Sequence, residues 1–257
     1  MNKRIFASLF RFHPTRETLI PFVLGLVVWA LSFAMESARE TVWISIILRD
    51  IGMIYIVGIF FPLYYICRSG RKFSEFGLTF KKWYIVLPMN MLLGIFLLFF
   101  LMSENPEIGF HFDRPTLARV GYIMIAGIFE VIFFYSFQRT FFERAFGIVP
   151  GIVLTSLFYS IHHIGFQPEY GKLFFVGLMY ATLFRLGNSV FMIYPFFWGV
   201  GACFDVLIQS QVVSLIFYPE IRSLYLMVFI LIAIVRVLKK LKGEMANVRL
   251  SKILLLG

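Results

Sequence analysis

The sequence predicts an all-α polytopic membrane protein of about eight transmembrane helices, and three observations lead to this prediction. Hydrophobic residues make up 60% of the 257 residues and charged residues only 15%, whereas soluble domains are close to half apolar and a quarter charged. Apolar runs long enough to cross a bilayer recur along the chain. The charges between these runs alternate in sign. Because no polar stretch is long enough for a soluble domain, we expect residues 1–257 to form a single membrane domain.

The apolar runs set the expected helices. A spanning helix needs roughly 17–25 mostly apolar residues, and most of the runs approach that length. The sixth and eighth are shorter, and the sixth is expected to extend to Gly187. The runs are Leu19–Met35, Ile51–Cys67, Trp83–Met102, Leu117–Phe142, Ala145–Gln167, Leu173–Phe184, Ser189–Ile208 and Ser223–Leu238.

The charges between the runs predict the orientation. Basic residues dominate the N-terminus, every second connection and the C-terminal tail, whereas the other connections are mixed or acidic. By the positive-inside rule, both termini are expected in the cytoplasm, in a protein of the plasma (inner) membrane. The net charge of +10 therefore indicates contact with the lipid bilayer rather than with nucleic acid. Arg49 and Asp50, at the entry of the second run, are expected at the membrane interface.

Four ionisable residues lie inside the predicted helices: Glu130, His162, His163 and Asp205. Such groups are costly in a bilayer, and each is therefore a candidate functional residue. At about 1.5 Å per residue, Glu130 lies roughly 18 Å deep and His162 and Asp205 roughly 21–24 Å deep, a common layer. His163 points about 100° away from His162, so we expect only one of the two at a shared site. A buried carboxyl can also form a purely structural interhelical hydrogen bond.

The residues around these candidates resemble three motifs of one protease family. The stretch FEVIFFYSFQRTFFERAFG begins one residue before Glu130, and Phe158-x-x-x-His162 follows downstream. Further on, the segment WGVGACFDVL contains Asp205, the last residue of a third pattern. In this order they resemble the motifs Glu-Glu-x-x-x-Arg, Phe-x-x-x-His and His-x-x-x-Asn/Asp of the CAAX-protease and bacteriocin-processing (CPBP) family. That family includes type II CAAX prenyl endopeptidases, and the resemblance covers residues 75–210.

The resemblance implies an intramembrane endopeptidase. Its first Glu and second-motif His, here Glu130 and His162, would activate water against a peptide or membrane-protein substrate, while Asp205 would stabilise the oxyanion. Tyr135, Phe158 and His163 would support them. The departures are Val131 for the second Glu, Tyr135 for Arg, Ser136 for Gly and Gly201 for the third-motif His.

Three alternatives stay open on these residues. The departures also fit a catalytically impaired scaffold or regulator of a partner protein. A transporter or ion pathway lined by Glu130, His162 and Asp205 is a further alternative, although the sequence lacks the repeat symmetry that many transporters show. Zinc would need three protein ligands, which Glu130, His162 and Asp205 could supply. Because no His-Glu-x-x-His pair is present, we expect metal-free glutamate chemistry without a cofactor.

Overall fold

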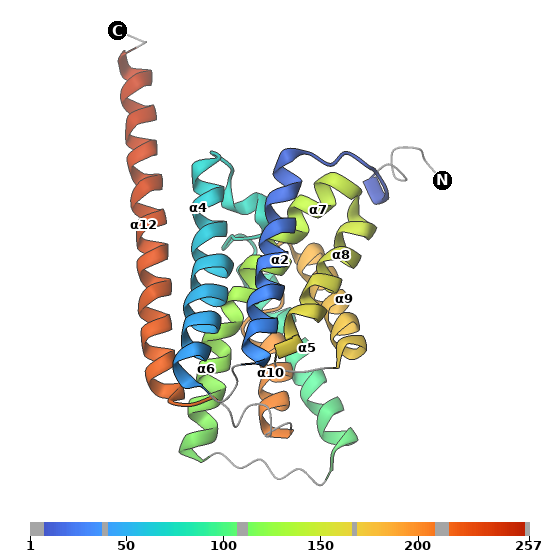
Figure 1. Ribbon diagram of the computed structural model, residues 1–257. Helices are drawn as coiled ribbons and strands as arrows, with labels where there is room; N and C mark the ends of the chain where they lie inside the picture. Colours follow the sequence, from blue (N-terminus) through green and yellow to red (C-terminus); the bar gives the residue numbers. More distant parts are fainter. Residues whose placement is uncertain (1–7, 38–40, 107–112, 166–168, 209–215, 255–257) are drawn as a thin grey trace.

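A computed structural model describes residues 8–37, 41–106, 113–165, 169–208 and 216–254, and within these ranges the regular elements are all helical (Figure 1). Short 3₁₀ and π-helical segments, labelled η, extend or join the α-helices. The elements are α2 (Arg16–Glu36), α3 (Val42–Ser45), η1 (Ile46–Phe60), α4 (Phe61–Arg68), η2 (Phe73–Phe76), α5 (Trp83–Glu104), α6 (Arg114–Glu130), η3 (Val131–Gln138), α7 (Arg139–Phe146), α8 (Ile148–Ile161), η4 (His162–Gly165), α9 (Tyr170–Gly187), η5 (Val190–Met192), α10 (Phe196–Ile208) and α12 (Pro219–Leu254).

The described helices indicate an integral membrane protein. Four continuous helical stretches are long and apolar enough to cross a bilayer, and a shorter apolar helix covers Ile148–Ile164. The four stretches are Arg16–Glu36, Val42–Arg68, Trp83–Glu104 and Arg114–Phe146. The all-helical class is therefore confirmed, whereas the count of about eight spans stays a prediction.

Several predicted helix boundaries are wrong. The seventh run was expected to start at Ser189, but Val190–Met192 forms a separate 3₁₀ turn and α10 begins at Phe196. The fifth run was expected to start at Ala145, but a break at Gly147, with φ +92°, assigns Ala145 to the preceding helix. A side chain is excluded there, because a Cβ atom would lie 2.5 Å from the carbonyl oxygen of Leu9. The last helix continues through the basic tail to Leu254 instead of ending at Leu238, and it passes the end of the bundle (Figure 1).

The break at Gly147 folds α7 and α8 into a tight helical hairpin. The helices approach closely at Gly151, where a Cβ atom would lie 2.6 Å from the backbone nitrogen of Glu143. From the turn, α8 runs back for 14 residues, which is about 21 Å. Glu130 lies about 24 Å before the same turn. The hairpin thus places Glu130 and the residues that end α8 at a similar depth.

α2 holds the end of α8. The Trp29 indole nitrogen donates a hydrogen bond to the Phe158 carbonyl at 3.0 Å, and the Ser32 hydroxyl donates to the His162 carbonyl. These side chains satisfy carbonyl groups that a helix end leaves without an intrahelical partner. The α-helix ends at Ile161, and His162–Gly165 continues as a 3₁₀ turn.

A buried ion pair ties α12 to η1 and α6. The Arg222 guanidinium binds both carboxylate oxygens of Asp50, through Nε at 2.7 Å and Nη2 at 2.6 Å. The hydroxyl of Tyr122 donates to Asp50 at 2.5 Å, and Tyr225 donates to its other oxygen. Both charged side chains are at most 1% exposed. Asp50 is therefore buried between helices, where Arg222, distant in the sequence, compensates its charge. The expectation that it lies at the depth of the membrane interface stays a prediction.

Removing one member of this pair is expected to destabilise the fold strongly. An Arg222→Met variant should lose about 3–5 kcal/mol of unfolding free energy, because the Asp50 charge would stay buried without compensation. Arg236→Met is the matched control, since Arg236 lies exposed on the same helix. Thermal unfolding in detergent, followed by circular dichroism, measures both. Equal unfolding temperatures for the two variants would contradict this assignment.

Candidate functional site

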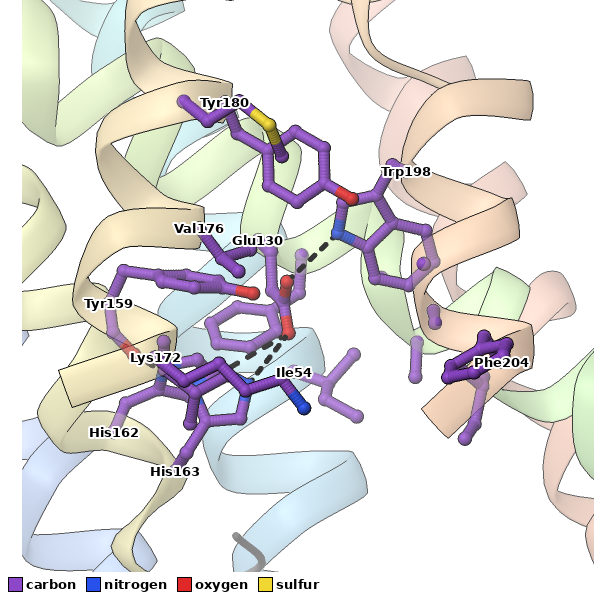
Figure 2. Close-up of a pocket in the computed structure, with 18 of the residues that line it drawn as sticks. Ile54, Glu130, Tyr159, His162, His163, Lys172, Val176, Tyr180, Trp198 and Phe204 are labelled. Atoms are coloured by element: carbon purple, nitrogen blue, oxygen red, sulfur yellow. Dashed lines mark hydrogen bonds and ion pairs between the residues drawn. The ribbon is translucent and has the colours of Figure 1, made fainter. Parts of the chain in front are cut away.

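Glu130 ends α6 and directs its carboxylate into the bundle (Figure 2). Its side chain is 13% exposed, which is little for an ionisable group. The Trp198 indole nitrogen, on α10, donates a hydrogen bond to Glu130 Oε2 at 3.0 Å. This bond holds one carboxylate oxygen and leaves the other, Oε1, directed toward the end of α8.

Two histidines face that second oxygen. Nε2 of His162 lies 3.6 Å from Glu130 Oε1, and Nε2 of His163 lies 3.9 Å from the same atom. Nδ1 of both rings contacts the Tyr159 carbonyl oxygen, at 2.5 Å for His162 and 2.9 Å for His163. A carbonyl oxygen can only accept, so each Nδ1 must carry the hydrogen. In the neutral rings, both Nε2 atoms therefore present a lone pair to Glu130.

The expectation that His163 would face away from His162 is wrong. The rotation of about 100° per residue describes the directions in which neighbouring side chains leave an α-helix, whereas here both rings turn back toward the same Tyr159 carbonyl oxygen. Because the rings share the Tyr159 carbonyl, they come together with centroids 3.9 Å apart. His163 thus joins Glu130 and His162, and the ligand atoms of the three lie within 4.8 Å of one another.

A cavity of about 230 Å³ opens beside the three side chains. Most of its lining is apolar, with Leu97, Val176 and Phe204 among the contributing side chains. Arg49 and Lys172 also line it. The Lys172 side chain is 54% exposed and forms a surface ion pair with Glu169, so this part of the cavity reaches the protein surface. The cavity therefore gives the buried carboxylate a route to water.

A glycine on α6 makes room for the tryptophan that holds Glu130. A Cβ atom at Gly127 would lie 1.9 Å from the ring of Trp198, a distance that forces the ring to move. Trp198 is 4% exposed, so the ring has little space to move into. The indole can reach the Glu130 carboxylate only because residue 127 has no side chain.

A Gly127→Ala variant is expected to disturb this contact. It should cost about 1–3 kcal/mol of unfolding free energy through overpacking and change the tryptophan fluorescence spectrum. Gly121→Ala is the matched control on the same helix, because a Cβ atom there meets nothing within 4 Å. That control should be neutral or slightly stabilising, since Ala favours a helix over Gly by up to about 1 kcal/mol. A fully tolerated Gly127→Ala would show that Trp198 is not confined here.

The position of the missing third-motif histidine is occupied by a neighbouring side chain. A Cβ atom at Gly201 would lie 2.8 Å from the Tyr180 hydroxyl oxygen. Tyr180, on α9, is 3% exposed, and both residues line the cavity. Figure 2 shows the hydroxyl end of Tyr180 beside Trp198, near the Glu130 carboxylate. The Tyr180 hydroxyl, which donates to the Phe197 carbonyl at 3.5 Å, therefore lies against residue 201 at the cavity wall.

The other predicted site residues are less directly involved. The Tyr135 hydroxyl has no hydrogen-bond partner among the described residues, and Trp198 is the residue that binds Glu130. Phe158 stacks on Trp29 with ring centroids 4.4 Å apart, so it supports the end of α8 from the α2 side. Asp205 belongs to α10, but its side chain lies outside the described part of the structure.

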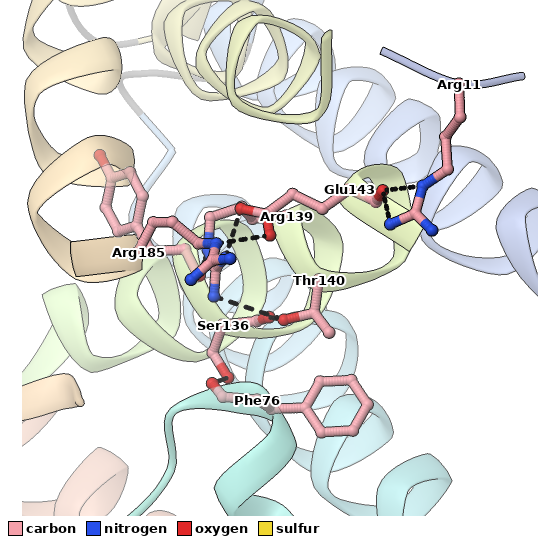
Figure 3. A network of polar contacts seen from close by, with 8 residues as sticks. Arg11, Phe76, Ser136, Arg139, Thr140, Glu143 and Arg185 are labelled. Carbon is pink, nitrogen blue, oxygen red and sulfur yellow. Dashed lines mark hydrogen bonds and ion pairs between the residues drawn. The ribbon is translucent and has the colours of Figure 1, made fainter. Parts of the chain in front are cut away.

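A second polar network lies in α7, the helix that follows η3 (Figure 3). Glu143 is bound by Arg139 at 2.5 Å and by Arg185 at 3.0 Å. Its backbone carbonyl accepts two hydrogen bonds from Arg11. Arg139, which lies within the fourth predicted run, is 2% exposed. This network joins the N-terminal segment, α7 and α9, and its carboxylate is fully used by the two arginines.

An exposed ion pair lies close to this network. The charged form of Glu75, in η2, accepts a hydrogen bond from the Lys72 backbone nitrogen at 3.2 Å and another from Arg144 at 2.7 Å. Both bonds stabilise the charged carboxylate and lower the pKa of Glu75 from its ordinary value, the bond from the Lys72 backbone more than the bond from Arg144. Glu75 therefore stays ionised at neutral pH and holds η2 against the end of α7.

Sequence reasoning missed Trp198, Tyr180 and the Tyr159 carbonyl. Tryptophan and tyrosine in membrane helices were expected to be interfacial anchors, and nothing in the local pattern separates an anchor from a buried donor. One signal was present. Trp198 lies three residues before Gly201 and seven before Asp205, so it shares a helix face with the third motif.

Comparisons with known proteins return no match, whether to protein-family models, to curated proteins or to solved structures.

Proposed function

We propose that the chain is an intramembrane endopeptidase of the CPBP type, in which Glu130 and His162 activate a water molecule to hydrolyse a peptide bond. The supporting observation is the 3.6 Å distance between Glu130 Oε1 and His162 Nε2 beside a cavity within the bundle. The distance is too long for a direct hydrogen bond. A water molecule beside the pair can donate to both atoms, which is the arrangement that general-base catalysis requires.

Each step can be assigned to a side chain. Glu130 takes a proton while the water oxygen bonds to the peptide carbonyl carbon. The same carboxyl then gives that proton to the departing nitrogen as the C–N bond breaks. His162, held by the Tyr159 carbonyl, orients the water through the Nε2 lone pair. The Tyr180 hydroxyl donates to the developing oxyanion, in place of the histidine absent at position 201.

The proposal includes a membrane arrangement. The chain spans the plasma (inner) membrane about eight times with both termini in the cytoplasm, as the alternation of loop charge favours. Residues 75–210 form the catalytic core of a single domain. The substrate is a peptide or membrane-protein segment that enters the apolar cavity from the bilayer, because Leu, Val and Phe side chains line much of it.

Glu130→Gln is expected to abolish cleavage, because an amide cannot take the proton from water. Purified protein is assayed on a panel of quenched-fluorescent apolar peptides of roughly 20 residues, the length of a membrane span. Glu36→Gln is the matched control, since Glu36 lies exposed at the end of α2, and it should retain full activity. Undiminished cleavage by Glu130→Gln would reject the mechanism.

Tyr180→Phe is expected to lower kcat by about 10²–10³-fold, the usual effect of losing one oxyanion donor. KM should change little, because the donor acts on charge that develops in the transition state. Tyr84→Phe, an exposed tyrosine of α5, serves as the control. If Tyr180→Phe keeps the wild-type kcat, the oxyanion donor is another group.

A second candidate function is a non-catalytic membrane scaffold or regulator of a partner protein. The observation that favours it is the loss of charge in the first motif. Val131 is buried among apolar side chains, and the Tyr135 hydroxyl binds no described residue. In this case the panel of peptides stays uncleaved, and Glu130→Gln and His162→Asn both retain biological function.

A further inference from the structure

We propose that Glu130, His162 and His163 form a binding site for a divalent transition-metal ion, with Zn²⁺ as the best fit. This set differs from the one that the sequence suggested, because His163 replaces Asp205. Two imidazole nitrogens and one carboxylate oxygen are donors that zinc prefers. Three protein ligands with one open position are typical of catalytic rather than structural zinc sites.

The distances fit an ion after a small contraction. Zn²⁺ binds nitrogen and oxygen ligands at about 2.0–2.1 Å, so two ligands of a tetrahedral site lie roughly 3.3 Å apart. The observed distances from Glu130 Oε1 are 3.6 Å to His162 Nε2 and 3.9 Å to His163 Nε2. The two Glu130 distances therefore shorten by about 0.3–0.6 Å. The three ligand atoms lie within 4.8 Å of one another, so the widest pair closes by up to about 1.5 Å through side-chain rotation.

The hydrogen bonds around the three residues orient their lone pairs toward that centre. Both Nδ1–H groups donate to the Tyr159 carbonyl, which leaves both Nε2 atoms as acceptors. The Trp198 indole holds Oε2, which leaves Oε1 for the same centre. Three acceptor atoms thus converge with no hydrogen between them, an arrangement that a cation stabilises. Metal-binding histidines almost always donate their other ring N–H to such an outer partner.

The surroundings are compatible with a bound cation. The Glu130 carboxylate supplies one negative charge, and water reaches the open position through the cavity. Arg49 and Lys172 line the same cavity, but each has a partner. Arg49 lies over the Tyr122 ring, 5.2 Å from its centroid, and Lys172 is bound to Glu169. When bound, the ion would lower the pKa of a coordinated water. It would also occupy the Glu130 and His162 lone pairs that the metal-free hydrolysis uses, so the metal-bound and metal-free arrangements are alternative states of one site.

The test measures metal binding without any substrate. Full-length protein in detergent is freed of metal with a chelator and titrated with Co²⁺, whose visible absorption bands report coordination number and ligand type. We expect one saturable site per chain with a four- or five-coordinate spectrum, and displacement of Co²⁺ by Zn²⁺. Added Zn²⁺ should also raise the unfolding temperature, since it binds only the folded site. Absence of saturable Co²⁺ and Zn²⁺ binding would overturn the proposal.

A pair of histidine variants identifies the ligands. His163→Asn should weaken Co²⁺ binding by at least about 100-fold, since even outer-shell changes cost 10–100-fold. His13→Asn, in the exposed N-terminal segment, should bind like the wild type. Unfolding temperatures measured without metal show whether each variant is folded. Unchanged affinity in His163→Asn, or an equal loss in His13→Asn, would overturn the assignment.

A third variant keeps the proposal testable if His163→Asn does not fold. Trp198→Phe removes the hydrogen bond to Glu130 Oε2 together with part of the buried ring, leaves all three ligands in place and should weaken Co²⁺ binding by about 10–100-fold. Affinity equal to that of the wild type would count against the site. The result is separate from the hydrolysis. Saturable binding supports the metal site even where no peptide is cleaved, and its absence rejects the site even where peptides are cleaved.

Discussion

The close packing of α7 against α8 is the constraint on which the site depends. Gly147 reverses the chain in a conformation that a side chain would obstruct, and Gly151 lets the returning helix approach the backbone at Glu143. The close packing of α7 and α8 fixes the position at which the end of α8 contacts α2. Had the reversal been wider, the two histidines would lie away from Glu130, and the carboxylate would face only apolar side chains.

The described part of the bundle buries carboxylates at Asp50, Glu143 and Glu130, and it stabilises each of them differently. Asp50 is fully neutralised by Arg222 and two tyrosines. Glu143 is bound by two arginines. Glu130 receives a single strong hydrogen bond, from Trp198, and otherwise faces two imidazoles at distances too long for hydrogen bonds. The first two arrangements serve the fold, because their partners satisfy the charge. The Glu130 carboxylate can therefore still bind a proton, a water molecule or an ion, as functional groups inside membranes commonly do.

The side-chain contacts in the structure change the interpretation of the departures from the CPBP motifs. Gly201 was counted as the loss of a histidine, yet the Tyr180 hydroxyl stands where that side chain would begin. Tyr135 was considered as a substitute donor to Glu130, and Trp198 takes that part instead. His163, considered structural or peripheral, faces the carboxylate. The groups that surround Glu130 in the structure come from α8, α9 and α10.

The sequence by itself determined the all-helical class, the presence of long apolar helices and the approximate extent of most helices. These follow from local properties, because run length, hydropathy and the rise per residue are readable along one segment. It could not determine which groups meet. Asp50 finds Arg222 172 positions away, and Glu130 meets Trp198 68 positions away. Such contacts depend on how helices cross and turn, and the His162–His163 geometry depends on the Tyr159 carbonyl that both rings contact and on the bond from Ser32 to the His162 carbonyl. Only the tertiary structure decides these, because α2 and the Gly147 hairpin impose them from outside the local sequence.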